Sequence, residues 1–520
     1  MFRRLIITAL PLALAGTILA GCAVTATTPT NESTRASTSH VETTTEVSSD
    51  IPAAAAELLA ANADGTVVKD DEWSATDAST ITLAGSSATT DATGVEVSSG
   101  TVTITAAGVY RLTGSYSGQV VVAAPDDALV VLILDGANIT NASGSGIHVV
   151  SADDVAISLA DGSTNSVTAA SSADADASAA IYADTDLTLS GTGSLTVTDT
   201  GNDGISSTDD LAIIGGAITV DAADDALRGK DSLVVKSGTL TLTAGGDALK
   251  SDQTDGATQG YVWIAGGTID ASAGDDGIDA QTDVIVTGGT LTLATDDDGI
   301  HSETALAITG GDVTIARSYE GLESADIRIA GGQTQVTSSD DGVNASGSAS
   351  SGSNGGGGGM QNTGETLTIS GGTLVVTATG DGLDSNGTIT MTGGDVTVYG
   401  PTANDNGALD SNGGITVTGG TLAAIGSSGM AESPELSSAQ GWLAANVTGA
   451  AGSTVEIRDS TDTVIASYTS PKSFASVVFS SAAITTGQSY TVAVGSTTVS
   501  VTAGQASAGG MGGGMGGGRP

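Results

Sequence analysis

The sequence has a single cysteine, few aromatic residues and few basic ones. One cysteine in 520 residues excludes a framework of disulfide bonds. Aromatic residues make up 3% of the chain, which argues against a stacked Trp/Tyr platform of the kind that binds neutral sugar rings. Only 14 lysines and arginines accompany 59 aspartates and glutamates, so the formal net charge is −45. Because nucleic acids and anionic lipid surfaces are polyanions, neither is expected as a direct ligand.

What the chain does have is a regular repeat, marked by Gly-Gly pairs. The pairs begin at Gly266, Gly288, Gly310, Gly331, Gly371, Gly393 and Gly419. The steps between successive starts are 22, 22, 21, 40, 22 and 26, and the two long steps contain insertions at 346–359 and 401–405. The underlying period of about 22 residues is typical of a repeat fold in which each unit stacks on the next.

Alternation within the repeat identifies the unit. Apolar residues stand two apart before and after each glycine pair, as in Val284/Val286 and Leu291/Leu293, which is strand spacing. A third short strand follows an acidic turn, as in Asp298-Gly299-Ile300. Three strands per repeat without a helical period predict an all-β fold, a right-handed parallel β-helix with about 22 residues per rung.

The N-terminus has the pattern of an export signal. Arg3 and Arg4 precede an apolar run over residues 5–20, too short for a membrane span, and Leu19-Ala20-Gly21-Cys22 resembles a bacterial lipobox. We therefore expect a signal peptide over 1–21, a lipid on Cys22 and a flexible Ser/Thr-rich tether over 22–70. This predicts an exported protein on the outer face of the cell membrane, in contact with the membrane only through that lipid.

The remaining chain divides into three parts. The repeats and their less regular lead-in predict a β-helix domain over 71–440. Strand-like runs without the period predict a small antiparallel β cap over 441–503, which would cover the open edge of the last rung. Residues 504–520 are rich in glycine and methionine and are expected to form a disordered tail. We expect a monomer.

One turn column is acidic in rung after rung. Stacked rungs lie ~4.8 Å apart, and two carboxylates at that distance repel by roughly 3 to 4 kcal/mol at an effective dielectric of ~20. Calcium–oxygen bonds of ~2.4 Å let one Ca²⁺ fit between two such oxygens. The alternative is that each aspartate only shapes its turn through backbone hydrogen bonds. The candidate calcium ligands are Asp225, Asp247, Asp275, Asp276, Asp279, Asp297, Asp298, Asp340, Asp341 and Asp381.

A neighbouring column is chemically mixed and holds the few basic residues. Arg228, Lys230 and Lys250 form a basic spot on adjacent rungs. The spot either pairs with aspartates of the acidic column or holds a sugar carboxylate. Trp263 offers a lone stacking surface, although a single Trp on a rung also suits packing under a loop. The candidate carbohydrate-binding residues are Arg228, Lys230, Lys250, Trp263 and His301.

Six segments carry a resemblance to a known family. They are AGVYRLTGS (107–115), LILDGANIT (132–140), AIYADTDLTLSGTGSLTV (180–197), DDALRGKDSL (224–233), GDALKSD (246–252) and SPKSFASVVFSS (470–481). In this order they resemble a bacterial family labelled carbohydrate-binding domain-containing protein, over nearly everything from residue 73 to about 500. The resemblance implies a polysaccharide-lyase-like β-helix that binds calcium and sugar polymers, acidic ones and cellulose among them.

Three functions stay open. The first, which we favour, is a calcium-dependent, non-catalytic protein that binds an acidic polysaccharide. The second is a polyuronate lyase, in which Ca²⁺ neutralises the substrate carboxylate and Lys250, Arg228 or Lys230 removes a proton. The third is a structural or adhesion protein whose ions serve stability alone. A hydrolase is disfavoured, because Arg228-Gly229-Lys230 resembles the Arg-x-Lys of polygalacturonases but His301 follows that motif instead of preceding it.

Overall fold

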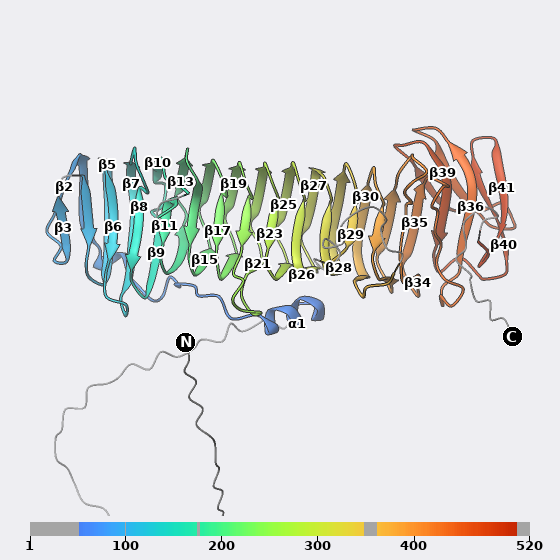
Figure 1. The fold of residues 1–520 in the computed structure, drawn as a ribbon, viewed down its shortest axis with the longest axis horizontal. Coiled ribbons are helices and arrows are strands. Elements are labelled where there is room, and N and C mark those ends of the chain that lie inside the picture. Colours follow the sequence, from blue (N-terminus) through green and yellow to red (C-terminus); the bar gives the residue numbers. More distant parts are fainter. Residues whose placement is uncertain (1–50, 99, 174–176, 348–360, 507–520) are drawn as a thin grey trace, which may run out of the picture. The chain divides into compact units, whose positions relative to one another are not determined.

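A computed structural model describes residues 51–98, 100–173, 177–347 and 361–506. All of these belong to one unit, Glu46–Pro520. The expected signal peptide, the lipidated Cys22 and most of the expected C-terminal tail lie outside the described residues. Strands dominate the described part, which confirms the predicted all-β fold, and most of them join one long sheet in which parallel pairing prevails (Figure 1).

Three series of parallel strands make up this sheet. The threonine series contains β1 (Ser79–Gly85), β5 (Gly108–Ser117), β7 (Leu129–Thr140), β10 (Thr164–Ala169), β13 (Ser194–Asp199), β16 (Ala217–Ala222), β19 (Thr239–Ala244), β22 (Thr268–Ala273), β25 (Thr290–Thr295), β27 (Asp312–Ser318), β28 (Leu322–Ser338), β30 (Thr366–Thr377), β33 (Asp395–Tyr399) and β35 (Thr421–Gly426). The acidic-turn series contains β4 (Thr101–Ile104), β6 (Gln119–Ala123), β8 (Ile147–Ser151), β11 (Ala179–Ala183), β14 (Asp203–Ser207), β17 (Leu227–Gly229), β20 (Leu249–Ser251), β23 (Ile278–Ala280), the start of β26 (Ile300–Ile308), the start of β28, β29 (Val343–Ala345) and β31 (Leu383–Ser385).

The third series, which we call the strap-facing series, follows each acidic-turn strand. It contains the starts of β5 and β7, β9 (Asp154–Leu159), β12 (Asp186–Gly191), β15 (Asp210–Ile213), β18 (Ser232–Val235), β21 (Tyr261–Ile264), β24 (Asp283–Val286), the end of β26, parts of β28 and β30, β32 (Thr388–Met391) and β34 (Ile415–Val417). Where the repeats are regular, the pairing partners of all three series are separated by one sequence period, as with Asp279 and His301. The sequence period therefore equals the pairing step.

The core lies between the three series. Val284, Val286, Leu291 and Leu293 are fully buried, as their spacing predicts, and equivalent residues of the other repeats continue the same cluster. Because side chains on a strand alternate between its two faces, the threonines between them point outward. The core is thus continuous from one repeat to the next.

The Gly-Gly pairs occupy the corner between a strap-facing strand and a threonine strand. Gly289 has φ +90°, in the left-handed region that favours glycine. A Cβ atom on Gly288 would lie 2.6 Å from the carbonyl oxygen of Ala265 in the preceding repeat. One glycine is needed for its backbone angle and the other for close stacking, so the pair recurs with the repeat.

Antiparallel strands begin and end the sheet. At the N-terminal end, β2 (Ser87–Thr90) and β3 (Val95–Ser98) pair antiparallel with β1 and β4. At the other end, β39 (Phe474–Ser480) pairs antiparallel with both β35 and β36 (Trp442–Gly449). A separate four-stranded sheet contains β38 (Val464–Thr469), β37 (Thr454–Arg458), β40 (Ser489–Val494) and β41 (Thr497–Thr502). The edge of the last parallel threonine strand is therefore paired.

The expectation of a flexible tether through residue 70 is wrong for residues 51–70. Helix α1 (Ala53–Ala61) lies against β24 and β26 (Figure 1). It buries Ala55 and Leu58 against outward apolar residues of these strands. The following segment, residues 62–78, which we call the strap and which includes the 3-10 turn η1 (Ala75–Asp77), crosses the strap-facing series. Among the described residues, no helix is long and apolar enough to span a membrane.

Hydrogen bonds to distant side chains hold the strap in place. Asn62 Nδ2 donates to Asp283 Oδ2 at 2.8 Å, the Thr66 amide donates to Asp210 Oδ2 at 2.7 Å, and the Val68 amide donates to Thr188 Oγ1 at 3.0 Å. The apolar residues between 51 and 59 form a docking face. It packs because the strap-facing strands present small and branched apolar side chains outward.

The docking of α1 is testable by adding one charge. Leu58→Asp should release the helix, since a nine-residue helix depends on tertiary packing for its stability. Hydrogen exchange over residues 51–62 should rise, while the melting temperature changes little because Leu58 lies outside the main core cluster. Ala60→Asp adds the same charge at an exposed position and is the control. Equal exchange in the two variants would contradict this docking.

Candidate functional site

The acidic column forms a ladder of carboxylates at the start of the acidic-turn strands. Asp225 Oδ1 accepts the Asp247 amide proton and Asp247 Oδ1 accepts that of Asp276, both at 2.9 Å. Asp276 Oδ1 accepts the Asp298 amide proton at 2.8 Å, and Asp298 Oδ1 accepts that of Glu320 at 3.1 Å. The backbone hydrogen bonds predicted as the alternative to calcium are therefore present, but the amides belong to the next repeat and not to the aspartate's own turn. One oxygen of each carboxylate accepts such a bond.

Burial raises the pKa of these acids. The pKa is about 8 for Asp276, about 7 for Asp298 and about 8 for Glu320. Loss of hydration is the largest cause, and the negative charge of neighbouring carboxylates adds to it, Asp298 acting on Asp276 and Glu323 on the other two. The ladder therefore favours a positive partner, either protons or a metal cation.

Among the described residues, four groups of three side chains bring their ligand atoms within 4.8 Å of one another. Three groups offer carboxylate oxygens alone, and a Ca²⁺ ion with bonds of ~2.4 Å spans that distance. The fourth includes an imidazole, a ligand better suited to transition metals than to calcium. The all-carboxylate groups are Asp247/Asp275/Asp276, Asp276/Asp297/Asp298 and Asp298/Glu320/Glu323, and the fourth is Asp276/Asp279/His301. Asp276 belongs to three of the four.

An orphaned amide oxygen lies beside the third group. Asn344 Nδ2 donates to Glu320 Oε2 at 2.8 Å, and Asn344 is buried. Its Oδ1 has no hydrogen-bond partner within the part of the chain that the structure describes. An amide oxygen is a ligand that Ca²⁺ accepts. The donor set here therefore fits a hard cation.

Sequence reasoning missed Glu320 and Glu323 as ligands. Glu320 stands one full period after Asp298, in the acidic column, so its position was a usable signal. Glu323 pairs in register with His301 and belongs to the mixed column, where no pattern distinguishes a ligand. The group of Asp298, Glu320 and Glu323 contains only one aspartate, so it exists as a group only because of these two glutamates.

Four predicted ligands do not join such a group. Among residues 51–98, 100–173, 177–347 and 361–506, no group of three close ligand atoms includes Asp225, Asp340, Asp341 or Asp381. Asp341 Oδ1 accepts the Asp381 amide proton at 2.5 Å, and Asp381 Oδ1 accepts that of Gly407 at 2.5 Å. At this end of the ladder, the carboxylates accept hydrogen bonds from backbone amides.

The basic spot is paired with carboxylates. Lys250 Nζ contacts Asp247 Oδ2 and lies 3.6 Å from Asp225 Oδ2 and 3.9 Å from Asp279 Oδ2. Arg228 Nη2 donates to Asp252 Oδ2 at 2.7 Å. Burial alone would lower the pKa of Lys250, but the three carboxylates outweigh it and raise that pKa. Of the two sequence interpretations, ion pairing accounts for these contacts.

Lys230 differs from its two neighbours. Its side chain forms no ion pair with any residue that the structure describes, and its backbone amide donates to the Ser207 carbonyl at 3.1 Å. It lies one residue beyond the end of β17, on the same repeat as Arg228. Of the three basic candidates, it is the one whose charge is not held by a carboxylate contact.

His301 and Trp263 lie in different surroundings. His301 Nδ1 is 3.0 Å from Asp279 Oδ1. Burial alone would lower the pKa of His301. The negative charges of Asp279 and neighbouring acids outweigh that effect, and the pKa rises to about 9. Trp263 lies on the strap-facing strand β21, donates from Nε1 to Thr287 Oγ1 at 3.0 Å, and packs against the α1 cluster. The packing interpretation fits Trp263, with α1 as its cover.

Comparisons with known proteins match the region of the ladder. Residues 98–342 match the family model described as carbohydrate-binding domain-containing protein. The chain is 36% identical to the polysaccharide lyase-like protein from C. thermocellum, whose structure was solved as a gadolinium derivative. That alignment covers 44% of this chain and 95% of the other, with a TM-score of 0.43. A search of curated proteins found no match. Every group of close ligands lies inside the matched residues.

The contacts of Lys250 predict a large effect on stability. Lys250→Gln leaves Asp225 and Asp247, with side chains 7% and 3% exposed, without their cation. Unfolding free energy at neutral pH in chelator should fall by roughly 3 kcal/mol, since removal of one partner strands a buried charge. Arg317→Gln breaks an exposed pair with Asp296 and should cost less than about 1 kcal/mol. Denaturant titration measures both, and equal losses would refute the distinction.

Proposed function

The chain belongs to the carbohydrate-binding domain-containing protein family, and from this premise we propose that it is a calcium-loaded, non-catalytic binding protein for acidic polysaccharides of the polyuronate type. The observation that carries the proposal is the set of three all-carboxylate groups on successive repeats. In the proposed architecture, a right-handed parallel β-helix with one sequence period per rung presents these groups, and a C-terminal β cap over 441–503 closes it.

Calcium links the charge of the protein to that of its ligand. A chain with a net charge of −45 repels a polyuronate unless cations stand between them. Ca²⁺ takes six to eight oxygen ligands, and each group here supplies three side chains. Bound ions would thus keep coordination positions for the carboxylates of a uronide chain. The repeat of the ligand groups suits a polymer whose charges also repeat.

The surroundings of Lys250 support binding without turnover. A lyase base must lose its proton near the working pH. Three carboxylates around Nζ raise the pKa of Lys250 and stabilise its protonated form, which opposes that role. Arg228 is held by Asp252. Neither side chain has the carboxylate-free surroundings that the lyase hypothesis requires.

Location follows from the N-terminal sequence. We propose that the protein is exported and held at the outer face of the cell membrane by a lipid on Cys22, because the residues before it have the pattern of a lipoprotein signal. The tether in this proposal shortens to residues 22–50, since α1 and the strap dock on the sheet.

Calcium removal tests the ion part of the proposal. Excess chelator should lower the melting temperature, because an ion that binds only the folded chain stabilises it by about 2.7 kcal/mol at 100 times its Kd. Asp276→Asn, which alters three groups at once, should remove most of the response. Asp126→Asn, at an exposed position outside these groups, should keep it. Scanning calorimetry with elemental analysis decides, and a metal-free protein with an unchanged curve would sink the ion hypothesis.

Binding of polygalacturonate tests the ligand part. Titration calorimetry should detect binding that needs Ca²⁺, weakens with added salt and falls in Asp276→Asn but not in Asp126→Asn. No rise in ultraviolet absorbance from unsaturated uronide ends should accompany it at alkaline pH. A lack of calcium-dependent binding rejects the acidic ligand. A rise in absorbance that Lys250→Ala abolishes would establish the lyase instead.

A further inference from the structure

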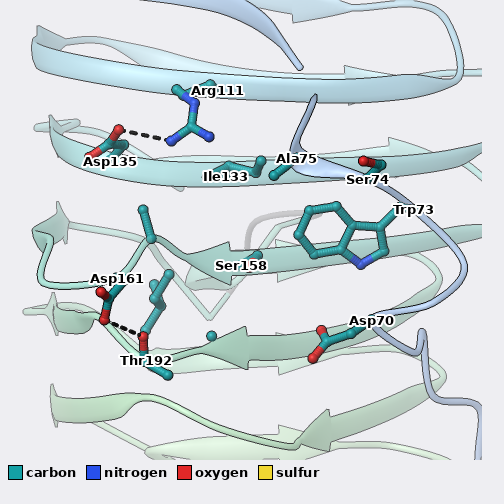
Figure 2. Close-up of a pocket in the computed structure, with 13 residues that line it drawn as sticks. Asp70, Trp73, Ser74, Ala75, Arg111, Ile133, Asp135, Ser158, Asp161 and Thr192 are labelled. Atoms are coloured by element: carbon teal, nitrogen blue, oxygen red, sulfur yellow. Dashed lines mark hydrogen bonds and ion pairs between the residues drawn. The ribbon is translucent and has the colours of Figure 1, made fainter. Parts of the chain in front are cut away.

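A second candidate site lies between the strap and the strap-facing strands of the repeats that precede the ladder. It is a pocket of about 590 Å³. Figure 2 shows Trp73 and Asp70 of the strap on one side, with Arg111, Asp135 and Asp161 on the other. The volume is within the ~300–1,000 Å³ of sites for small molecules. None of the candidate site residues named from the sequence lines this pocket.

The floor and the aromatic wall of the pocket are apolar. Ile133 and Leu159 are buried beneath it. Trp73 is part-buried and packs against the cluster of Val68 and Ile133, which holds the indole at the pocket side of the strap. An indole held in this way presents a flat apolar face, with area that a partner can cover at little cost in side-chain entropy.

Polar groups converge on the opposite wall. Arg111 Nη1 donates to Asp135 Oδ2 at 2.8 Å, and Thr192 Oγ1 donates to Asp161 Oδ1 at 2.9 Å (Figure 2). The Arg111 guanidinium has no other ion pair or hydrogen bond within the described ranges. Guanidinium donors and carboxylate acceptors side by side match hydroxyl groups, which both donate and accept.

The charge of the pocket selects against an acid. Three carboxylates, from Asp70, Asp135 and Asp161, line it with a single guanidinium, so their formal sum is −2. A uronate would meet like charge here, and a like-charge contact at an interface is costly. A neutral ring with several hydroxyls meets acceptors, a donor and an apolar face at once.

We propose that this pocket binds a neutral pyranose unit of a polysaccharide, with the indole of Trp73 against the C–H face of the ring and Arg111, Asp135 and Asp161 hydrogen-bonded to its hydroxyls. The inference rests on the proposed polysaccharide-binding function and adds a subsite to it. This subsite needs no metal ion, unlike the ladder. The strap is essential to it, because the strap supplies the aromatic wall.

The test uses the whole chain in excess chelator, where the proposed calcium-dependent site is silent. The probes are tetrasaccharides of glucose, mannose and xylose, with tetragalacturonic acid as the charged comparison, and titration calorimetry gives Kd. At least one neutral probe should bind, and tetragalacturonic acid should not. Trp73→Ala should weaken binding by about tenfold or more, since a central aromatic carries much of the energy of a site, and Trp73→Phe should weaken it less.

Two further variants separate binding from folding. Asp161→Ala changes an exposed rim residue outside the core and should also weaken the neutral probe. Asp126→Ala, at an exposed position that does not line the pocket, should leave the Kd unchanged. Failure of every neutral probe, or a Kd unaffected by both Trp73→Ala and Asp161→Ala, overturns the subsite. Loss of calcium-dependent polygalacturonate binding would reject the proposed function instead, so the two failures are distinguishable.

Discussion

In-register parallel pairing is the constraint on which the rest of this structure depends. Each residue in the regular repeats stands beside the equivalent residue of the preceding repeat, in all three strand series. Like residues therefore stack on like. For apolar residues this builds a continuous core, and for the glycine pairs it allows the close approach that a Cβ atom would prevent. For acidic residues the same rule has a cost, because it brings carboxylates to strand spacing.

The ladder meets that cost in two ways along its length. At Asp225 and Asp247 the counter-charge is covalently part of the chain, as Lys250 contacts both. Beyond Asp276, none of the described lysines and arginines forms an ion pair with Asp297, Asp298, Glu320 or Glu323. Backbone amides engage one oxygen of Asp276 and of Asp298, which leaves the other for an external cation. The ladder thus has a built-in cation at one end and carboxylate groups at the other, and the proposed calcium binding uses the second end.

Local periodicity let the sequence predict the repeat, the three strands and the column that holds Asp276 and Asp298. It could not predict contacts between segments that differ in pattern. Asn62 meets Asp283 across 221 residues, and the apolar patch near Leu58 resembled part of a linker because its docking surface is made of outward residues such as Ile285. Glu323 was missed for a related reason, since its column varies from repeat to repeat.

The stacked repeats and the single strap suit different parts of one proposed ligand. Stacked repeats offer the same carboxylate groups several times, which matches a chain of equal charges but cannot define a place on it. A unique pocket needs a segment that breaks the repeat, and the strap is such a segment. It brings Trp73, one of three tryptophans in the chain, over strands that carry Arg111 and Asp135. In the proposed function the ladder sets affinity for a polymer, while the strap adds a position at which one neutral unit is distinguished from its neighbours.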